Sequence, residues 1–255
     1  MTPAQRIEHL TQGLVAARQQ RRLFTPDAGA QALTTAEAYA VQAGVAAAMG
    51  WFPNGPRAWK AGGASTVSGA PLPEVLRSPA VWHPASPPAA DGGPSEWIVE
   101  AELAFEIAGG PAAPGQAPEL GTVAVAIELI DTRLSTGLSS PSAWKLADQG
   151  VHGGLVLGEP RPASLVAHFS LDDWQAQAWS IDIHGQPQVQ ARGGLPAVSP
   201  MPAMAWLADH AAAHTGGLCP GDVVTTGAWG VVRARRGDLV TVKFAGVGEA
   251  QVTLA

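Results

Sequence analysis

The stretch VEAELAFEI, residues 99–107, alternates apolar and acidic side chains. A period of two is typical of a half-buried β-strand, so Glu100 and Glu102 are expected on one face, roughly 6.7 Å apart along the strand. Two neighbouring carboxylates on an otherwise apolar strand repel each other and lose hydration, and a hard divalent cation with oxygen ligands offsets both effects. Glu106 lies on the same face, so the alternation leaves open which pair binds a metal. A solvent-facing polar strand edge is the alternative interpretation.

A second segment, AIELIDTRL at 126–134, places Glu128 inside an apolar run. A lone glutamate among valine, isoleucine and leucine needs a partner or a metal. Three carboxylates from the two segments would leave positions on an octahedral Mg²⁺ or Mn²⁺ for water and for a bidentate 2-oxo acid. Asp131 and Arg133 follow closely, either as a pair that supports this site or as an ordinary surface ion pair.

A third segment, WKAGG at 59–63, sets Lys60 between a tryptophan and small residues that allow a close neighbour to approach. Partial desolvation or a nearby metal would lower the pKa of this lysine towards the range that is useful for proton transfer. Taken alone, the segment is equally typical of a loop lysine beside glycine.

The rest of the chain from about residue 56 indicates a β-rich body. Glycine and proline clusters separate short runs with strand composition. A mostly antiparallel β core is expected, and not βαβ units. Two stretches rich in proline, glycine and alanine, 83–95 and 109–120, are expected to form surface loops, the second as a long connection between two strands. The expected strands are 97–107, 123–130, 154–157, 179–183, 222–226 and 239–244.

Helices are expected mainly at the N-terminal end. Apolar residues recur at helical spacing over 4–20, and Thr34 and Glu37 have the spacing of a capping box before a helix over 35–49. One more helix is expected near 202–214. We therefore predict a single domain over 1–255, with 1–50 as a helical cap and 56–255 as the β body.

Composition excludes several classes of protein. The net charge of −6 argues against nucleic acid as the main partner, because phosphate binding needs clustered lysine and arginine. No run approaches the roughly 18 apolar residues of a membrane helix, and the N-terminus lacks the apolar core of a signal peptide. The single cysteine, Cys219, fits a reducing cytoplasm. With 46% hydrophobic and 14% charged residues, a homo-oligomer is expected.

One histidine pair has the spacing of a possible second metal site. His210 and His214 have the spacing of a zinc helix, but no acid stands beside the first histidine, so a solvated helix face is expected.

The order of these segments along the chain is similar to that of the 2-keto-4-pentenoate hydratase family, which includes the 4-oxalocrotonate decarboxylases and lies within the fumarylacetoacetate hydrolase superfamily. The collinear set is far more specific than any one motif. The matching segments are WKAGG at 59–63, VEAELAFEI at 99–107, AIELIDTRL at 126–134, LADQGVHGGLVLG at 146–158, GDVVTTGAWG at 221–230 and FAGVGEAQVTL at 244–254.

The resemblance implies an α+β fold, a mixed β-sandwich roll of the fumarylacetoacetase C-terminal type with an N-terminal helical cap. It implies Mg²⁺ or Mn²⁺ held by Glu100, Glu102 and Glu128, and an acid/base role for Lys60. A small 2-oxo acid is the implied partner. Residues near this substrate would be Gly62, Asp131, Thr226 and Gly227.

Two departures from the family pattern concern proton transfer. Family hydratases carry an aspartate within about twenty residues after the lysine motif, whereas Glu74 is the only acid here in 61–90. The family's Asn-Ala-Ser-Ser stretch is replaced by Gln149, Gly150, Val151 and His152. We therefore expect poor hydration of the simplest substrate, 2-hydroxypenta-2,4-dienoate, unless Glu74 replaces the aspartate and His152 points away from the pocket.

Four functions remain open from the sequence. The leading expectation is hydration of a 2-hydroxydienoic acid. Its rivals are decarboxylation of a 4-oxalocrotonate-like acid, which needs an extra carboxylate pocket, and hydrolysis of an acylpyruvate, for which His152 or His83 would have to activate water. A binding relative that has lost turnover is the alternative of another class.

Overall fold

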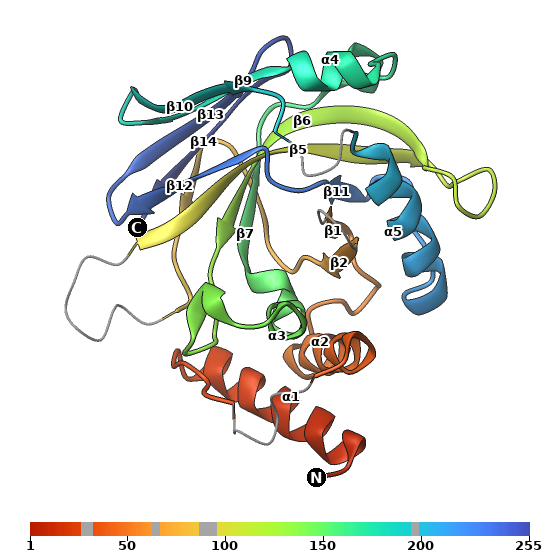
Figure 1. Cartoon of the computed structure of the whole chain (residues 1–255), viewed down its shortest axis with the longest axis vertical. Coiled ribbons are helices and arrows are strands. Elements are labelled where there is room, and N and C mark those ends of the chain that lie inside the picture. The colour runs from red at the N-terminus through yellow and green to blue at the C-terminus, as the bar shows by residue number, and fades with distance from the viewer. Residues whose placement is uncertain (27–32, 63–66, 87–95, 195–198) are drawn as a thin grey trace.

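The longest strands that the structure describes, β5 (Glu96–Gly109) and β6 (Glu119–Ile130), run antiparallel through the middle of the molecule (Figure 1). The computed structural model describes residues 1–26, 33–62, 67–86, 96–194 and 199–255. Backbone pairing sets Glu100 opposite Glu128. Residues 110–118 join the two strands, as predicted, whereas most of the other expected loop, 87–95, lies outside the described residues.

The larger sheet is built around this pair and mixes parallel with antiparallel neighbours. β1 runs parallel to β11, and β3 runs parallel to β7, while the other pairs in this sheet are antiparallel. Its order is β2 (Ser68–Pro71), β1 (Ala58–Gly62), β11 (Val223–Thr225), β5, β6, β7 (His152–Leu157) and β3 (Val75–Arg77), with β12 (Gly230–Arg235) also paired to β5 and β8 (Arg161–Pro162) to β6.

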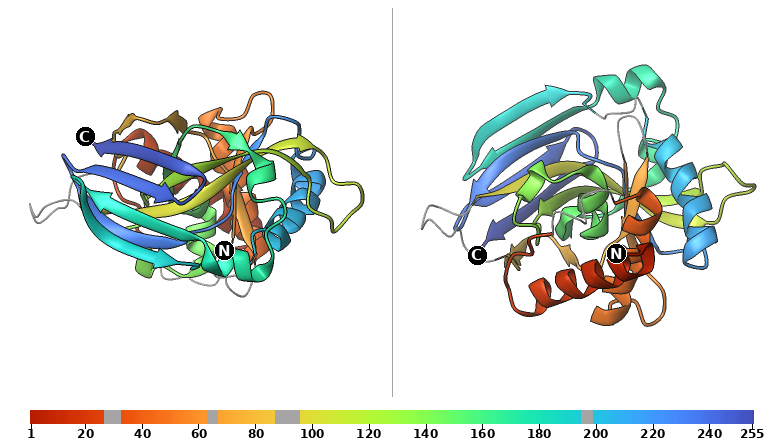
Figure 2. Two further views of the ribbon diagram at one scale, coloured as in Figure 1. Left: turned by 90° about the horizontal axis from the view of Figure 1, so that it is seen from above. Right: turned by 60° about the horizontal axis from the view of Figure 1, so that its bottom comes forward.

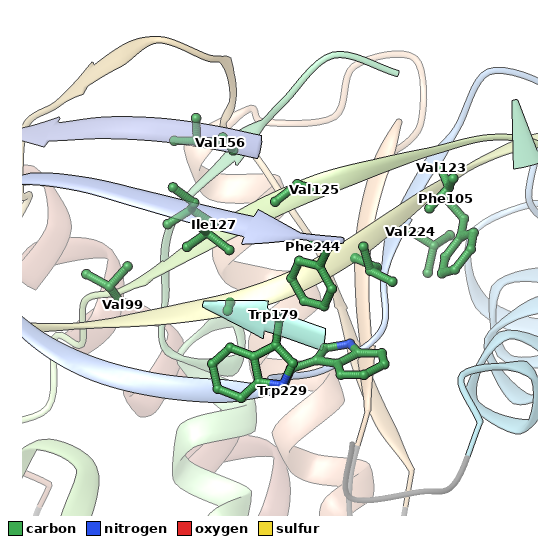
Figure 3. Packing of buried hydrophobic residues seen from close by; sticks show 14 of the residues in the cluster. Val99, Phe105, Val123, Val125, Ile127, Val156, Trp179, Val224, Trp229 and Phe244 are labelled. Atoms are coloured by element: carbon green, nitrogen blue, oxygen red, sulfur yellow. The ribbon is translucent and has the colours of Figure 1, made fainter. Parts of the chain in front are cut away.

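The smaller sheet packs on the larger one to close the roll. Its order is β10 (Gln186–Arg192), β9 (Ala178–Ile183), β13 (Leu239–Phe244), β14 (Gly248–Leu254) and β4 (Ala80–Trp82). Val125 and Ile127 of β6 share one buried cluster with Trp179 and Phe244 of the smaller sheet (Figure 3). The mixed, curled sheets with few helices confirm the expected fold.

The first two helices form the cap. The helices α1 (Pro3–Gln19) and α2 (Thr35–Met49) both begin with capping boxes, and α2 ends where Gly50 takes a left-handed conformation. The cap and the smaller sheet lie on opposite sides of the molecule (Figure 2). Helix α2 has the predicted bounds, and α1 differs from its prediction by one residue at each end.

The remaining helical segments connect strands. Helix α5 (Met201–His214) follows the prediction, while the short α3 (Ser142–Ala147) and α4 (Leu171–Ala176) were not expected. Single turns of 3₁₀-helix are η2 (Gly137–Ser139) and η4 (Ala163–Leu165), while the short segment η3 (Gln149–Val151) has left-handed backbone angles. Among the described residues, no helix is long and apolar enough to span a membrane.

Buried ion pairs attach the cap to the body. The carboxylate of Asp148, at the end of α3, accepts hydrogen bonds from Arg18 of α1 at 2.8 Å and from Arg133 Nε at 2.9 Å. Burial, followed by repulsion from Arg133, lowers the pKa of Arg18 to about 9. The pairing joins residues 130 positions apart, so it fixes α1 against the segment that follows β6.

Candidate metal centre and adjoining cleft

Three glutamates from β5 and β6 converge. Ligand oxygens of Glu100, Glu102 and Glu128 all lie within 4.8 Å of one another. Glu102 accepts hydrogen bonds from the Thr225 hydroxyl and from the Gly227 backbone N–H. Oxygen Oε2 of Glu128 is buried and has no hydrogen-bond partner among the described residues. A buried carboxylate oxygen without a donor is unfavourable, and a divalent cation held by three hard oxygen donors would satisfy it.

The fourth acid of this region, Glu106, is used differently. Its carboxylate accepts a hydrogen bond from the hydroxyl of Thr122, across the β5–β6 pair, at 3.2 Å. It is absent from the converging group. The alternation of acidic residues along β5 therefore continues beyond the converging group. Glu100 and Glu102 belong to that group, and Glu106 does not, because the strand register places Glu128 opposite Glu100.

The three carboxylates differ in pKa. Burial, then the charges of Glu128 and Glu100, raise the pKa of Glu102 well above its usual range. Burial, then Glu128, raise the pKa of Glu100 to about 7. Burial would raise the pKa of Glu128 as well, but Lys60 and His152 outweigh it and hold that pKa at about 2. Without a cation, the site therefore keeps protons near neutrality that a divalent metal would displace.

Lys60, on β1, points at the same site. Its Nζ donates to Glu128 Oε1 at 2.6 Å and to the Gly150 carbonyl at 3.2 Å. Burial lowers the pKa of Lys60, but Glu128, Glu100 and Glu102 together outweigh burial and raise it. The expectation of a depressed pKa is wrong for the protein without metal, because three carboxylates surround the ammonium. Lys60 therefore keeps its proton in the protein without metal.

A left-handed turn holds the Gly150 carbonyl in place. Gln149, Gly150 and Val151 have φ angles of 58°, 64° and 57°, a conformation that a β-branched residue rarely adopts. The Gln149 side chain donates to the Pro71 carbonyl at 2.7 Å, and the Asp131 N–H donates to the Val151 carbonyl at 2.9 Å. A Cβ on Gly150 would lie 3.1 Å from Lys60 Cδ. The turn therefore fits closely against Lys60.

His152 contacts the metal-binding group through Glu128. It is 3% exposed, and its Nδ1 lies 3.1 Å from Glu128 Oε1. An ionised carboxylate is an acceptor only, so Nδ1 carries the hydrogen. Neither Glu74 nor His83, both exposed, lines the cleft. The geometry supports neither Glu74 as a replacement for the family aspartate nor His83 as a water-activating base.

The metal site opens into a cleft with two adjoining parts. The near part, about 190 Å³, contains Lys60, Glu100 and Glu102 together with Gly62 and Gly227. A Cβ on Gly62 would lie 3.3 Å from the Gly227 Cα, so the two backbones approach closely. The far part, about 370 Å³, shares five lining residues with the near part and adds Ile130, Leu138, Ser142, Lys145 and Val151.

Two of the residues predicted near the substrate lie outside this cleft. Thr226 is buried, and its hydroxyl donates to the Leu103 carbonyl. Asp131 is buried and accepts from the Ala85 and Ser86 N–H groups. The surface ion pair considered for Asp131 and Arg133 is wrong: both are 2% exposed, 3.9 Å separates their charged atoms, and Arg133 bonds mainly to Asp148.

The candidate residues predicted from the sequence include neither Thr225 nor Lys145. Thr225 could have been noticed as the strand residue before the Thr-Gly turn, on the face opposite to Thr226. The left-handed turn and the position of Lys145 have no local signal.

The two histidines of α5 pack against each other, with ring centroids 4.5 Å apart. His210 stacks on Trp206 with ring centroids 4.7 Å apart and contacts Tyr39 at 4.6 Å. Among the described residues, the glutamate triad is the group of three or more metal-binding side chains. The predicted solvated face is correct for the exposed His214 but not for His210, which packs among aromatic rings.

Two solved structures of enzymes resemble this chain along most of its length. Among solved structures, 4-oxalocrotonate decarboxylase from Pseudomonas putida G7, complexed with magnesium and adipate, is 18% identical, with a TM-score of 0.79 over 100% of this chain and 99% of that one. Fumarylpyruvate hydrolase from Pseudomonas aeruginosa, in complex with Mn²⁺ and pyruvate, is 19% identical, with a TM-score of 0.51 over 78% of this chain and 89% of that one. At these identities the likeness shows the fold.

The search of curated proteins gave no match. Residues 123–255 match the family described as fumarylacetoacetate (FAA) hydrolase C-terminal. This match spans just over half of the chain, from within β6 to the last residue, and it includes every strand of the smaller sheet except β4. The chain belongs to the fumarylacetoacetate hydrolase C-terminal family.

Proposed function

We propose that the protein is a divalent-metal-dependent enzyme that acts on a small 2-oxo acid or on its 2-hydroxydienoic tautomer. The observation that carries this proposal is the buried Oε2 of Glu128, which has no hydrogen-bond partner in the described part of the chain and lies close to two further glutamates and to Lys60. Mg²⁺ or Mn²⁺ held by these carboxylates would act as a Lewis acid on the carboxylate and 2-oxo oxygens of the substrate.

The protein's own residues would hold and move one proton. Lys60 Nζ keeps its proton because of the carboxylates around it, and the Gly150 carbonyl and Glu128 orient it. Gly62 and Gly227 leave room for a planar acid beside the metal, since neither has a side chain. Lys60 would then deliver its proton to a carbon of the enolate.

Decarboxylation of a 4-oxalocrotonate-like acid is the reaction that this geometry supports best. In that reaction the bond to the departing carboxylate breaks, its electron pair enters the conjugated enolate, and no water needs a base. The described lining of the cleft has four titratable side chains, of which two are glutamates committed to the metal and two are lysines, Lys60 and Lys145. The full-length likeness to a 4-oxalocrotonate decarboxylase supports the same choice.

Hydration of a 2-hydroxydienoic acid, the leading expectation from the sequence, is the second candidate. The collinear motifs favour it, but addition of water at C4 calls for a further acid or base. Loss of one such group typically costs about 10²–10⁴ in rate. We therefore still predict poor turnover of 2-hydroxypenta-2,4-dienoate. Acylpyruvate hydrolysis is less well supported, because His152 is engaged with Glu128 and does not line the cleft.

An assay on metal-loaded protein separates these functions. The protein would be stripped with a chelator, reloaded with Mg²⁺ or Mn²⁺, and given 4-oxalocrotonate, 2-hydroxypenta-2,4-dienoate and an acylpyruvate. We expect metal-dependent CO₂ release from the first, lost in Glu128→Gln. A kcat/KM in the usual enzyme range of about 10⁴–10⁸ M⁻¹s⁻¹ on the dienoate would instead establish a hydratase. Metal-dependent binding without turnover of any of the three substrates would instead support a binding protein of this family that has lost turnover.

From composition, we still predict a homo-oligomer in the cytoplasm.

A further inference from the structure

Arg133 is buried and holds both ends of the left-handed turn at 149–151. It is 2% exposed and lines neither part of the cleft. Its Nη2 donates to the Asp148 carbonyl at 3.4 Å and to the His152 carbonyl at 3.2 Å. These two residues flank the three whose backbone angles are left-handed. One guanidinium therefore bridges the residue before the turn and the residue after it.

The same segment also fixes the side chain of Asp148. Arg133 donates to this carboxylate twice, from Nε at 2.9 Å and from its backbone N–H at 2.8 Å, and the Thr132 hydroxyl donates at 2.8 Å. A guanidinium is planar and presents its donors in a fixed fork, so Nε and Nη2 orient the carboxylate and the carbonyl together. The segment that follows β6 thus determines where the turn begins.

Val151 is the residue of the turn that most needs this restraint. A β-branched residue rarely adopts a positive φ, and here φ is 57°. Inside the turn, the Val151 carbonyl accepts from the Asp131 N–H, and the Gln149 side chain donates to the Pro71 carbonyl. A backbone in this conformation persists only where its surroundings enforce it. Releasing the two ends would let the turn relax.

Two routes lead from Arg133 to the metal centre. Through the turn it fixes the Gly150 carbonyl, which accepts from Lys60 Nζ at 3.2 Å. Through the backbone of His152 it fixes the imidazole, whose Nδ1 lies 3.1 Å from Glu128 Oε1. Lys60 Nζ donates to that same oxygen at 2.6 Å. A shift of the turn would therefore change the direction of the Lys60 ammonium.

We propose that Arg133 is a positioning residue for the Lys60 ammonium, which it holds in place by clamping the ends of the turn that presents the Gly150 carbonyl. Its effect on turnover rests on the proposed function, in which Lys60 delivers a proton. The placement of the ammonium does not rest on that function and can be measured without turnover.

Arg18 provides a matched control, because it donates to the same carboxylate from the cap. Its Nη2 lies 2.8 Å from Asp148 Oδ1, and its guanidinium lies over the Trp51 ring. Arg18→Met and Arg133→Met each remove one buried guanidinium, and each leaves Asp148 with one arginine. Of the two, only Arg133→Met releases the carbonyls of Asp148 and His152.

Nuclear magnetic resonance of the lysine ammonium groups measures the placement. The chain has three lysines, so Lys60→Ala identifies the Lys60 Nζ resonance in metal-free protein labelled with ¹⁵N-lysine. We expect Arg133→Met to move this resonance towards those of the other two lysines, and Arg18→Met to leave it in place. With Mg²⁺ restored, Arg133→Met should lower kcat on 4-oxalocrotonate about 10²-fold, as for a misplacement of about 1 Å at a reacting group. Arg18→Met should keep the native kcat.

Arg133→Gln isolates the clamp and covers the case in which Arg133→Met does not fold. The glutamine Nε2 stands where the arginine Nε stood, so the variant keeps a donor for Asp148 and lacks Nη2. It should move the Lys60 resonance and lower kcat as Arg133→Met does. A resonance that stays in place, or moves equally in Arg18→Met, overturns the positioning role, and so does an unchanged kcat. If the resonance moves only in the Arg133 variants but the native protein turns over no 2-oxo acid, the positioning stands and the proposed function fails.

Discussion

The Gly150 carbonyl oxygen lies 3.2 Å from Lys60 Nζ, although 90 residues separate the two positions. The carbonyl reaches the ammonium because three consecutive residues adopt left-handed backbone angles, two of them without being glycine. Strain of this kind persists only where surrounding structure enforces it, and it collects at functional sites. Here it orients the Lys60 ammonium beside the triad.

Gly150→Ala should displace Lys60. The new methyl group would lie 3.1 Å from Lys60 Cδ, and a misplacement of about 1 Å at a reacting group can cost about 10²-fold in rate. The matched control is Gly216→Ala, at another left-handed glycine (φ 88°) with nothing within 4 Å of its Cβ. We expect both variants to lose about 1 kcal/mol of unfolding free energy, and only Gly150→Ala to lose activity. Equal activity in the two variants would contradict the role of the turn.

Lys60→Ala should abolish turnover and strengthen metal binding. The variant removes the proposed proton donor and also a positive charge 2.6 Å from Oε1 of Glu128, the carboxylate whose other oxygen would bind the metal. Like charges repel, so we expect the Kd for Mn²⁺ to fall several-fold, measured by electron paramagnetic resonance titration. Lys243→Ala, which removes an exposed lysine, serves as the control. Retained activity would show that another group moves the proton.

His152→Phe should weaken the metal site without touching the cleft. The phenyl ring fills the buried space but cannot donate to Glu128 Oε1, which lies 3.1 Å from the imidazole. Groups that orient metal ligands are typically worth 10–100-fold in metal affinity. We expect a loss of at least about tenfold in Mn²⁺ affinity, with partial recovery in His152→Gln, whose amide can still donate. Unchanged affinity would mean that Glu128 is oriented by Lys60 alone.

Metal binding should release protons near neutral pH. Glu100 titrates at about 7 and Glu102 well above the usual value, so the folded protein without metal binds more protons than the unfolded chain between pH 4.5 and about 7. Its stability should therefore fall as pH rises through this window. Saturating Mn²⁺, which binds the ionised forms, should remove the decline in Tm. Titrations in buffers of different ionisation enthalpy would count the protons, and a pH-independent Kd would contradict the prediction.

Asp148→Ala should loosen the helical cap. The variant leaves Arg18 and Arg133 buried without their shared carboxylate, and breaking a buried pair typically costs about 3–5 kcal/mol. Asp182→Ala, whose partner Lys243 lies 4.0 Å away at the surface, is the control and should cost less than about 1 kcal/mol. Chemical denaturation measures both. Similar losses in the two variants would rule out the buried pairs as the anchor of the cap.

The sequence by itself determined the features that depend on local periodicity. Alternation over 99–107 is enough to predict β5 with Glu100 and Glu102 on one face, because successive side chains of a strand point to opposite sides. The capping box of Thr34 and Glu37 predicts where α2 begins, since its hydrogen bonds join residues three positions apart. An isolated Glu128 in an apolar run predicts either a charged partner or a cation, and the structure supplies Lys60 as the partner.

Only the tertiary structure decided which of these groups meet. The pairing of β5 with β6 sets Glu100 opposite Glu128, and that register depends on the whole sheet. Lys60, His152 and Lys145 come from three other segments, and their positions follow from how the sheet curls and where α3 packs. The raised pKa of Lys60 has the same origin. Its desolvation can be predicted from its neighbours in sequence, but the carboxylates that outweigh desolvation belong to strands 40 to 68 residues away along the chain. Contacts between distant segments depend on the global packing of the fold, and no local pattern encodes them.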